Sequence, residues 1–335
     1  MSGTRRPMPP VEQVRPGLWS IPVPIPNNPL RYVLVYALHT DRGPYLIDAG
    51  WNTDDSYGAL KGGLERMGTS VAEVQGVLVS HIHPDHFGLA GRIRQESGAW
   101  VGMHPADIEL IHGRYVEPGP LLQAVWDTLE MAGAPPDEME ALQQASMPVL
   151  PLVAATDPDV VMSDGFRPEV PGWDIRAIWT PGHTPGHLCF YDQRQRLMFS
   201  GDHVLPRITP NVSLLDEEGI DPLGDFLTSL RKVGAEDTEE VLPAHEHRFV
   251  GLSERVEELI AHHEDRFHQI ERIISEGATT AWEVAALMEW SRPWERISGF
   301  MRRMALFEAL AHLRALEVRG RLVPTGTTPR HWTLP

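Results

Sequence analysis

The 335-residue sequence has a single cysteine, Cys189, which excludes an intrachain disulfide and a metal site built from several thiolates. It has no apolar run of the roughly 18 residues that a membrane-spanning helix needs. Its first residues, MSGTRRPMPP, contain two arginines with no apolar stretch after them, so we expect no secretory signal. No G-x-S-x-G pattern occurs, which argues against a serine nucleophile elbow. These absences lead us to expect a cytoplasmic protein without membrane contact.

Basic residues are also scarce, because 29 Lys+Arg stand against 46 Asp+Glu, for a net charge of −17. A strongly acidic protein repels polyanions at long range. From Ala261 to the end, however, 10 Lys+Arg balance 9 Asp+Glu. Nucleic acid is therefore not the favoured partner, and only the C-terminal part leaves it open.

Short apolar and β-branched runs alternate with amphipathic segments through the first three quarters of the chain. Runs of strands with helices between them, without strict alternation, favour an α/β fold with two sheets and helices outside. Asp221 followed by Pro222 is typical of a helix start. We predict helices at residues 54–67, 85–95 and 221–233, and strands at residues 18–23, 32–39, 45–48, 76–80, 99–103, 175–179, 188–191, 196–200 and 240–242.

Two further segments have a helical character. Residues 105–151 contain helical patterns and many prolines, and we interpret them either as an insertion over the functional site or as a simple surface excursion. The C-terminal part contains three predicted helices, at 253–275, 279–288 and 301–316, followed by a hairpin within 318–332. We therefore predict a catalytic domain at 15–252 and a small helical, winged-helix-like domain at 253–335.

The segment HIHPDH at residues 81–86 carries the main chemical signal. His81, His83, Asp85 and His86 place four metal-capable side chains within six residues, directly after a predicted strand. Aspartate is rarely buried without a partner, so packing alone does not explain this density. Neutral imidazole and carboxylate are ligands that zinc and similar divalent metals prefer.

Three more candidate ligands follow later strands. His183 lies in the loop TPGHTPGH, Asp202 follows the predicted strand 196–200 after one glycine, and His245 follows the predicted strand 240–242 after Pro243 and Ala244. Each stands just after the C-terminal end of a predicted strand. One edge of a sheet can therefore gather ligands that are distant in sequence.

These motifs, in this order, resemble the metallo-β-lactamase superfamily over roughly residues 17–251. The early segment GPYLIDAG, with Asp48, matches the same family. The resemblance implies an αββα sandwich and two divalent metal ions, zinc first, with iron or manganese as alternatives. It implies that His81, His83 and His183 hold one metal, that Asp85, His86 and His245 hold the other, and that Asp202 bridges them.

The C-terminal part resembles the winged-helix appendage of a LACTB2-like, glyoxalase II-like branch of this superfamily. One departure matters. The loop after Asp202, His203 to Asn211, differs from that of glyoxalase II enzymes, so the resemblance does not extend to glutathione-binding residues.

Other polar residues near the motifs are open to several interpretations. We predict that Asp48 orients the histidine loop and that His203 lies behind the ligands. His187 is interpreted as a hydrogen-bonded structural residue, and the HEH run leaves a choice between His245 and His247. Arg207 is either a contact to an anionic part of the substrate or an ordinary surface arginine.

A dinuclear site lowers the pKa of water to about 7 and makes a hydroxide nucleophile. We therefore expect a hydrolase in which a metal-bridged hydroxide attacks a small-molecule acyl thioester, ester or lactone, with Asp85 as metal ligand and catalytic residue. One alternative is a phosphodiesterase or endoribonuclease on single-stranded RNA. Another is a mononuclear iron enzyme like the persulfide dioxygenases. An equally open interpretation of the C-terminal part is a role in dimerisation, which makes a homodimer a further hypothesis.

Overall fold

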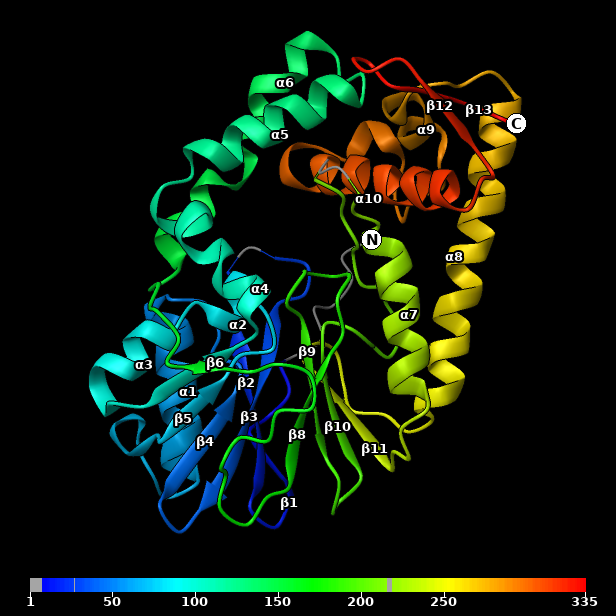
Figure 1. The fold of residues 1–335 in the computed structure, drawn as a ribbon. Helices are drawn as coiled ribbons and strands as arrows, with labels where there is room; N and C mark the ends of the chain where they lie inside the picture. The colour runs from blue at the N-terminus through cyan, green and yellow to red at the C-terminus, as the bar shows by residue number, and fades with distance from the viewer. Residues whose placement is uncertain (1–7, 27, 216–218) are drawn as a thin grey trace, which may run out of the picture.

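The computed structural model describes residues 8–26, 28–215 and 219–335, in which two β-sheets pack face to face between outer layers of helices (Figure 1). This αββα sandwich confirms the predicted fold class. Between the sheets lies a buried apolar cluster in which the rings of Tyr36 and Phe199 meet edge to face, with centroids 5.3 Å apart. Among the described residues, no helix is both long enough and apolar enough to cross a membrane.

The larger sheet has seven strands that follow one another in chain order. The first four pair antiparallel and the last four pair parallel, so the C-terminal ends of β4, β5 and β6 meet at one edge. The sequence did not indicate β1, a polar edge strand, or β7, which has two residues. The strands are β1 Glu12–Arg15, β2 Leu18–Pro24, β3 Tyr32–Thr40, β4 Gly43–Ile47, β5 Gly76–Leu78, β6 Trp100–Met103 and β7 Val160–Val161.

The smaller sheet has four strands in the order β11-β10-β9-β8. β10 runs parallel to β11 and antiparallel to β9, which in turn pairs antiparallel with β8. The ends of β8, β10 and β11 therefore meet at the same edge, as the sequence predicts. Their bounds are β8 Ile175–Trp179, β9 Leu188–Asp192, β10 Leu197–Gly201 and β11 Glu240–Pro243.

The helix predicted for residues 85–95 is wrong as a single element, because the chain forms two helices separated at Gly88 and Leu89. The carbonyl of His86 accepts a hydrogen bond from the Ala49 N–H (2.9 Å), and the Leu89 N–H donates to the Gly50 carbonyl (2.8 Å). These bonds replace the helical ones at the break. The helix predicted for residues 54–67 is present as α1 Asp54–Arg66. The other helices on this face are the short η1 Val71–Glu73, which the sequence did not indicate, α2 Pro84–Phe87 and α3 Ala90–Ser97.

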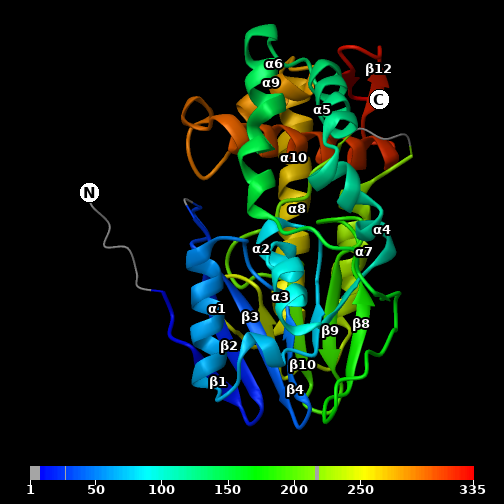
Figure 2. The same cartoon turned by 90° about the vertical axis from the view of Figure 1, so that its left-hand side faces the viewer.

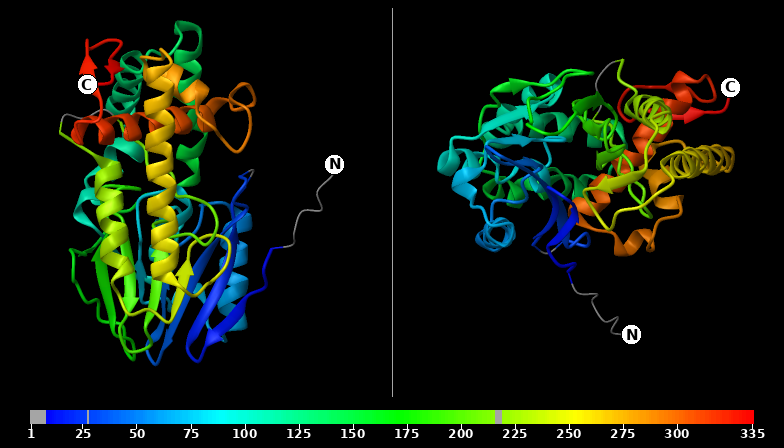
Figure 3. Two further views of the ribbon diagram at one scale, coloured as in Figure 1. Left: turned by 90° about the vertical axis from the view of Figure 1, so that its right-hand side faces the viewer. Right: turned by 90° about the horizontal axis from the view of Figure 1, so that it is seen from below.

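Helices α7 Pro222–Gly234 and α8 Leu252–Ser275 lie side by side along the outer face of the smaller sheet (Figure 3). The predicted cap of α7 is confirmed, since the Asp221 carboxylate accepts a hydrogen bond from the Gly224 N–H at 2.9 Å. Apolar residues of both helices join one buried cluster with the smaller sheet, including Phe226 and Phe267.

The insertion and the C-terminal helices lie at the same end of the sandwich, beyond α2 (Figure 2). They share one apolar cluster, to which Leu129, Val284 and Leu310 belong. The three predicted C-terminal helices and the hairpin are present, while the winged-helix comparison and the domain boundaries stay predictions. The elements are α4 Pro105–Ile108, the π-helix η2 His112–Val116, α5 Gly119–Met131, α6 Pro136–Gln143, η3 Gln144–Leu152, α9 Ala281–Leu287, η4 Trp294–Arg296, α10 Gly299–Val318, β12 Val323–Thr325 and β13 His331–Thr333.

Candidate metal centre

The seven predicted ligands converge at the edge where β5, β8, β10 and β11 end. Within the described residues they form three overlapping groups whose ligand atoms lie within 4.8 Å of one another: His81, His83 and His183; His81, His86 and Asp202; and Asp85, His86 and His245. The strand topology explains the gathering, because segments as far apart in the sequence as His81 and His245 leave their strands at one edge.

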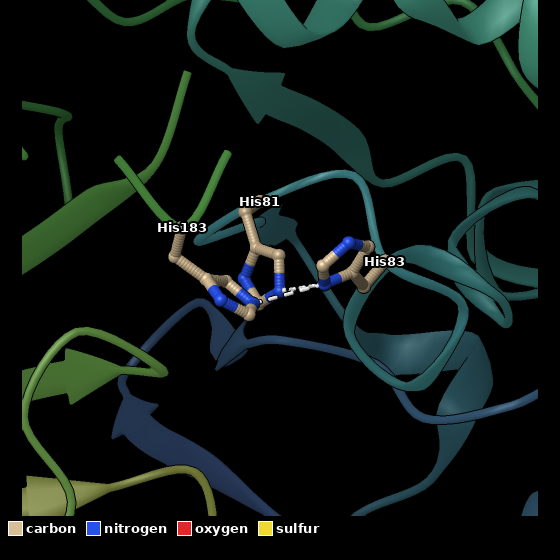
Figure 4. A group of neighbouring side chains, drawn as sticks. All are labelled: His81, His83 and His183. Carbon is tan, nitrogen blue, oxygen red and sulfur yellow. Dashed lines mark hydrogen bonds between the residues drawn. The ribbon is translucent and has the colours of Figure 1, made fainter. Parts of the chain in front are cut away.

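His81, His83 and His183 point their ring nitrogens at one another (Figure 4). The Nδ1 atom of His83 lies 2.9 Å from Nε2 of His81 and 3.0 Å from Nε2 of His183. Three imidazole nitrogens facing one point form a donor set suited to a divalent cation.

Asp85, His86 and His245 make a second group beside the first. Nε2 of His245 lies 3.4 Å from Oδ2 of Asp85, and Nε2 of His86 lies 3.6 Å from the same oxygen. Asp202 stands between the groups. Its Oδ1 is 3.2 Å from Nε2 of His245, and its Oδ2 is 3.7 Å from Nε2 of His183. The two oxygens of one carboxylate thus face different groups, as a bridging ligand would.

The hydrogen bonds on the outer side of the rings fix which nitrogen faces the centre. Nδ1 of His183 donates to the Asn211 carbonyl (2.7 Å), Nδ1 of His245 to the Tyr32 carbonyl (3.0 Å), and Nδ1 of His86 to Asp48 Oδ2 (2.8 Å). In a neutral imidazole the other nitrogen, Nε2, then carries a lone pair.

Three inner atoms, in the second group and on Asp202, lack protein partners. Among the described residues, Nε2 of His86, Nε2 of His245 and Oδ1 of Asp202 are buried without a hydrogen bond. Buried polar atoms normally have a partner, and a group of orphaned acceptors is what a cation site presents. The residues therefore fit a divalent metal site.

The electrostatics differ between the two groups. Burial and the neighbouring imidazoles lower the pKa of His81 and His83 well below the usual histidine value, so both rings stay neutral. Burial also disfavours a charge on His245, but Asp202 and Asp85 outweigh it and raise its pKa to about 10. The carboxylates that favour a proton there would equally stabilise a metal cation.

Asp48 lies behind the histidine loop and holds it. Besides His86, it accepts hydrogen bonds from the Ser80 N–H (2.8 Å) and the Ser80 hydroxyl (3.0 Å). The Ser80 oxygen in turn lies 3.0 Å from Nδ1 of His81. Asp48 has a positive φ of 64°, a backbone conformation that aspartate adopts more readily than most residues. This placement is compatible with the predicted orienting role.

Asp107, which the sequence analysis did not select, joins the two histidine loops. Its buried carboxylate accepts hydrogen bonds from the Ile82 N–H (2.9 Å), the Thr184 hydroxyl (2.8 Å) and the Gly186 N–H (2.7 Å). Burial raises the pKa of Asp107. Its position just after the parallel strand at 99–103 is the signal that could have revealed it.

His187 is a structural neighbour of Asp202. Its Nε2 accepts the Asp202 N–H at 3.1 Å, and its Nδ1 lies 2.8 Å from the Thr180 hydroxyl. With Nδ1 donating to Thr180, the ring sets the backbone at Asp202. Gly201 permits this approach, since a Cβ at that position would lie 2.7 Å from Nε2 of His187.

Three other candidates lie outside the cluster. The ring of His203 packs against Phe226, with centroids 4.9 Å apart. Arg207 is 57% exposed and pairs with Glu246 at 3.1 Å. His247 is exposed, whereas His245 is fully buried in the centre. Within the described residues, none of the three makes a hydrogen bond or ion pair to the seven, and the substrate role of Arg207 stays a prediction.

Comparison with known proteins agrees with this geometry. Residues 28–245 match the family model of the metallo-beta-lactamase superfamily. A solved metallo-beta-lactamase family protein from Thermus thermophilus is 31% identical, with a TM-score of 0.82 over 96% of this chain and 100% of that one. A beta-lactamase-like protein 2 homolog of Caenorhabditis elegans is 28% identical over 160 residues, 46% of this chain and 52% of that protein.

A third relative has a named activity, the atrochrysone carboxyl ACP thioesterase of Aspergillus fumigatus. It is 30% identical over 107 residues, 32% of this chain and 31% of that protein. The matched part is therefore about half of the nematode relative and a third of the fungal one. Because the family model covers most of the chain and one solved structure matches almost all of it, this protein belongs to the metallo-β-lactamase superfamily.

Proposed function

We propose that the chain is a dinuclear hydrolase that cleaves a small acyl thioester, ester or lactone. The observation that carries the proposal is the position of Asp202, whose two carboxylate oxygens face two separate donor groups. A mononuclear iron site would use only one of these groups. The second group of Asp85, His86 and His245 therefore favours the dinuclear alternative.

In this proposal His81, His83 and His183 would hold one metal ion, Asp85, His86 and His245 would hold the other, and Asp202 would bridge them. Divalent ions, zinc in our expectation, supply a hydroxide nucleophile at neutral pH and polarise the scissile oxygen. Asp85, whose Oδ2 lies 3.4 Å from Nε2 of His245, would both bind metal and orient the attacking water. Asp48 and the Asn211 and Tyr32 carbonyls keep the ring nitrogens of His86, His183 and His245 directed inward.

A thioester is the favoured substrate because a thiolate leaving group needs little protonation. An alkoxide or amine leaving group asks more of a general acid. The fungal relative named as a thioesterase supports the same substrate class.

The RNA alternative has less support. Several C-terminal arginines form ion pairs with carboxylates, which reduces the charge available to phosphates. These pairs are Arg302–Glu138, Arg319–Glu264, Arg321–Glu271 and Arg330–Glu317. A cytoplasmic location, a homodimer and a small-molecule partner remain proposals.

The test combines metal counting with a substrate panel. Protein loaded with zinc, manganese or iron is assayed on thioesters, esters, lactones, a phosphodiester and single-stranded RNA. We expect two metal ions per chain and acyl cleavage that His245→Ala abolishes. His247→Ala is the matched control, an exposed histidine two residues away that should leave turnover unchanged. The proposal is contradicted if the fully metal-loaded protein cleaves no acyl substrate or cleaves RNA alone. One iron ion per chain together with oxygen uptake would favour the dioxygenase alternative.

A further inference from the structure

The loop that follows Asp202 is held by the C-terminal helices. At its start, Arg255 of α8 donates from Nε to the Leu205 carbonyl (2.7 Å) and from Nη2 to the Ile208 carbonyl (3.1 Å). At its end, the Leu214 N–H donates to the Phe307 carbonyl of α10 at 3.1 Å. Val212 and Leu214 are buried in the apolar cluster that contains α10. The two C-terminal helices therefore fix both ends of a loop that lies against the metal centre.

One side chain connects α10 to a metal-centre histidine through this loop. Glu308 accepts a hydrogen bond on Oε2 from Nδ2 of Asn211 at 2.8 Å, and Oδ1 of Asn211 accepts one from the Ser213 hydroxyl at 2.7 Å. With both ends of its amide engaged, Asn211 is held in one orientation. Its backbone carbonyl then accepts the Nδ1 proton of His183 at 2.7 Å.

We propose that Glu308 is a positioning residue for His183: through Asn211 it fixes the carbonyl that orients the ring, so that the C-terminal helices form part of the metal centre. The inference rests on the proposed ligand role of His183. It gives the C-terminal part a function within the hydrolase itself, in place of an independent nucleic-acid-binding or dimerisation arm. Outer partners of metal-bound histidines set the ring direction and the basicity of the inner nitrogen.

Metal affinity gives a readout that does not depend on knowing the substrate. Zinc affinity is measured by competition with a chromophoric chelator, and the visible spectrum of the cobalt-loaded protein reports the ligand geometry. Loss of a direct outer partner of a ligand typically weakens metal binding by roughly 10–100-fold. Glu308 acts one residue further out, through Asn211, so for Glu308→Ala we expect a loss near the lower end of that range, about 10-fold. Glu308→Gln keeps an acceptor for Asn211 and should stay close to the unmodified protein. The double variant Glu308→Ala with Asn211→Ala should lose no more zinc affinity than either single variant, because both substitutions remove the same contact.

The matched control is Glu317→Ala, which removes a partly buried glutamate from the far end of the same helix. Glu317 pairs with Arg330 and accepts from Trp332 Nε1, with no contact to the loop among the described residues. It should lower stability without changing the zinc affinity or the cobalt spectrum. Equal zinc affinity of Glu308→Ala and the unmodified protein would overturn the inference. Equal losses of zinc affinity in Glu308→Ala and Glu317→Ala would also overturn it.

A His183→Ala variant separates this inference from the proposed function. If His183→Ala loses zinc while Glu308→Ala retains it with an unchanged cobalt spectrum, the metal centre stands and only the positioning role is wrong. If His183→Ala binds zinc as well as the unmodified protein does, the ligand assignment fails, and the inference fails with it.

Discussion

Replacing Asp107 tests whether one buried carboxylate holds the two histidine loops together. The residue is fully buried and accepts three hydrogen bonds, two from the Ile82 and Gly186 N–H groups and one from the Thr184 hydroxyl. Ile82 stands between two candidate ligands, and Thr184 and Gly186 follow a third. Losing the carboxylate therefore disturbs both loops of the first metal group.

The magnitude follows from the donors left without a partner. A buried unsatisfied donor costs about 1–3 kcal/mol, and Asp107→Ala leaves three of them, partly compensated by entering water. We expect the free energy of unfolding to fall by about 3–5 kcal/mol. Asp107→Asn keeps an oxygen toward Ile82 and Thr184 but turns an amide toward the Gly186 N–H, so it should cost about 1–3 kcal/mol.

Urea unfolding of the metal-free protein measures these losses, and metal analysis of the folded variants measures the effect on the site. Asp192→Asn is the matched control, because Asp192 is equally buried and accepts two backbone N–H groups at the end of β9 away from the site. Both Asn variants should lose stability, and only Asp107→Asn should bind metal more weakly. Unchanged metal affinity in Asp107→Asn, or equal weakening in Asp192→Asn, would refute the reasoning.

Three further outcomes are expected. Gly201→Ala should lower the free energy of unfolding by about 2–4 kcal/mol, because Gly201 has a φ of +51° and the new Cβ would lie 2.7 Å from Nε2 of His187. Denaturant titration measures this loss, and a value below about 0.5 kcal/mol would contradict the prediction. Burial raises the pKa of Glu308, whose side chain is partly exposed, to about 7. Between about pH 4.5 and 7 the Glu308 carboxyl group is therefore ionised in the unfolded chain and protonated in the folded one. The contribution of Glu308 to the free energy of unfolding should fall by about 2 kcal/mol as pH rises through that window. Glu308→Gln should remove that slope in unfolding measured from pH 5 to 8, and an unaltered slope would show that another group is responsible. Removing metal with a chelator should lower the melting temperature, since ligand at about a thousand times its Kd stabilises by roughly 4 kcal/mol; an unshifted transition would argue against a bound ion.

Much of the fold was predictable because the local signals agree with it. Short β-branched runs such as residues 32–39 form strands where expected, and Asp221 caps α7. The failures have local physical causes. Residues 85–95 have a helical pattern, but tertiary hydrogen bonds at His86 and Leu89 divide them into two helices. β7 has two residues and no sequence pattern of its own.

The candidate centre likewise has parts that the sequence predicts and parts that only the structure shows. The sequence by itself determined the candidate ligands and their chemical class, except for the choice between His245 and His247, because packing rarely accounts for imidazoles and carboxylates crowded at strand ends. Only the tertiary structure decided which atoms face inward, that Asp202 turns one oxygen to each group, and that Asp107 and Glu308 support the loops. The reason is physical: a ligand type is a property of one residue, whereas a hydrogen bond from an outer partner joins residues that are far apart in the chain and meet only after the sheets, the insertion and the C-terminal helices have packed.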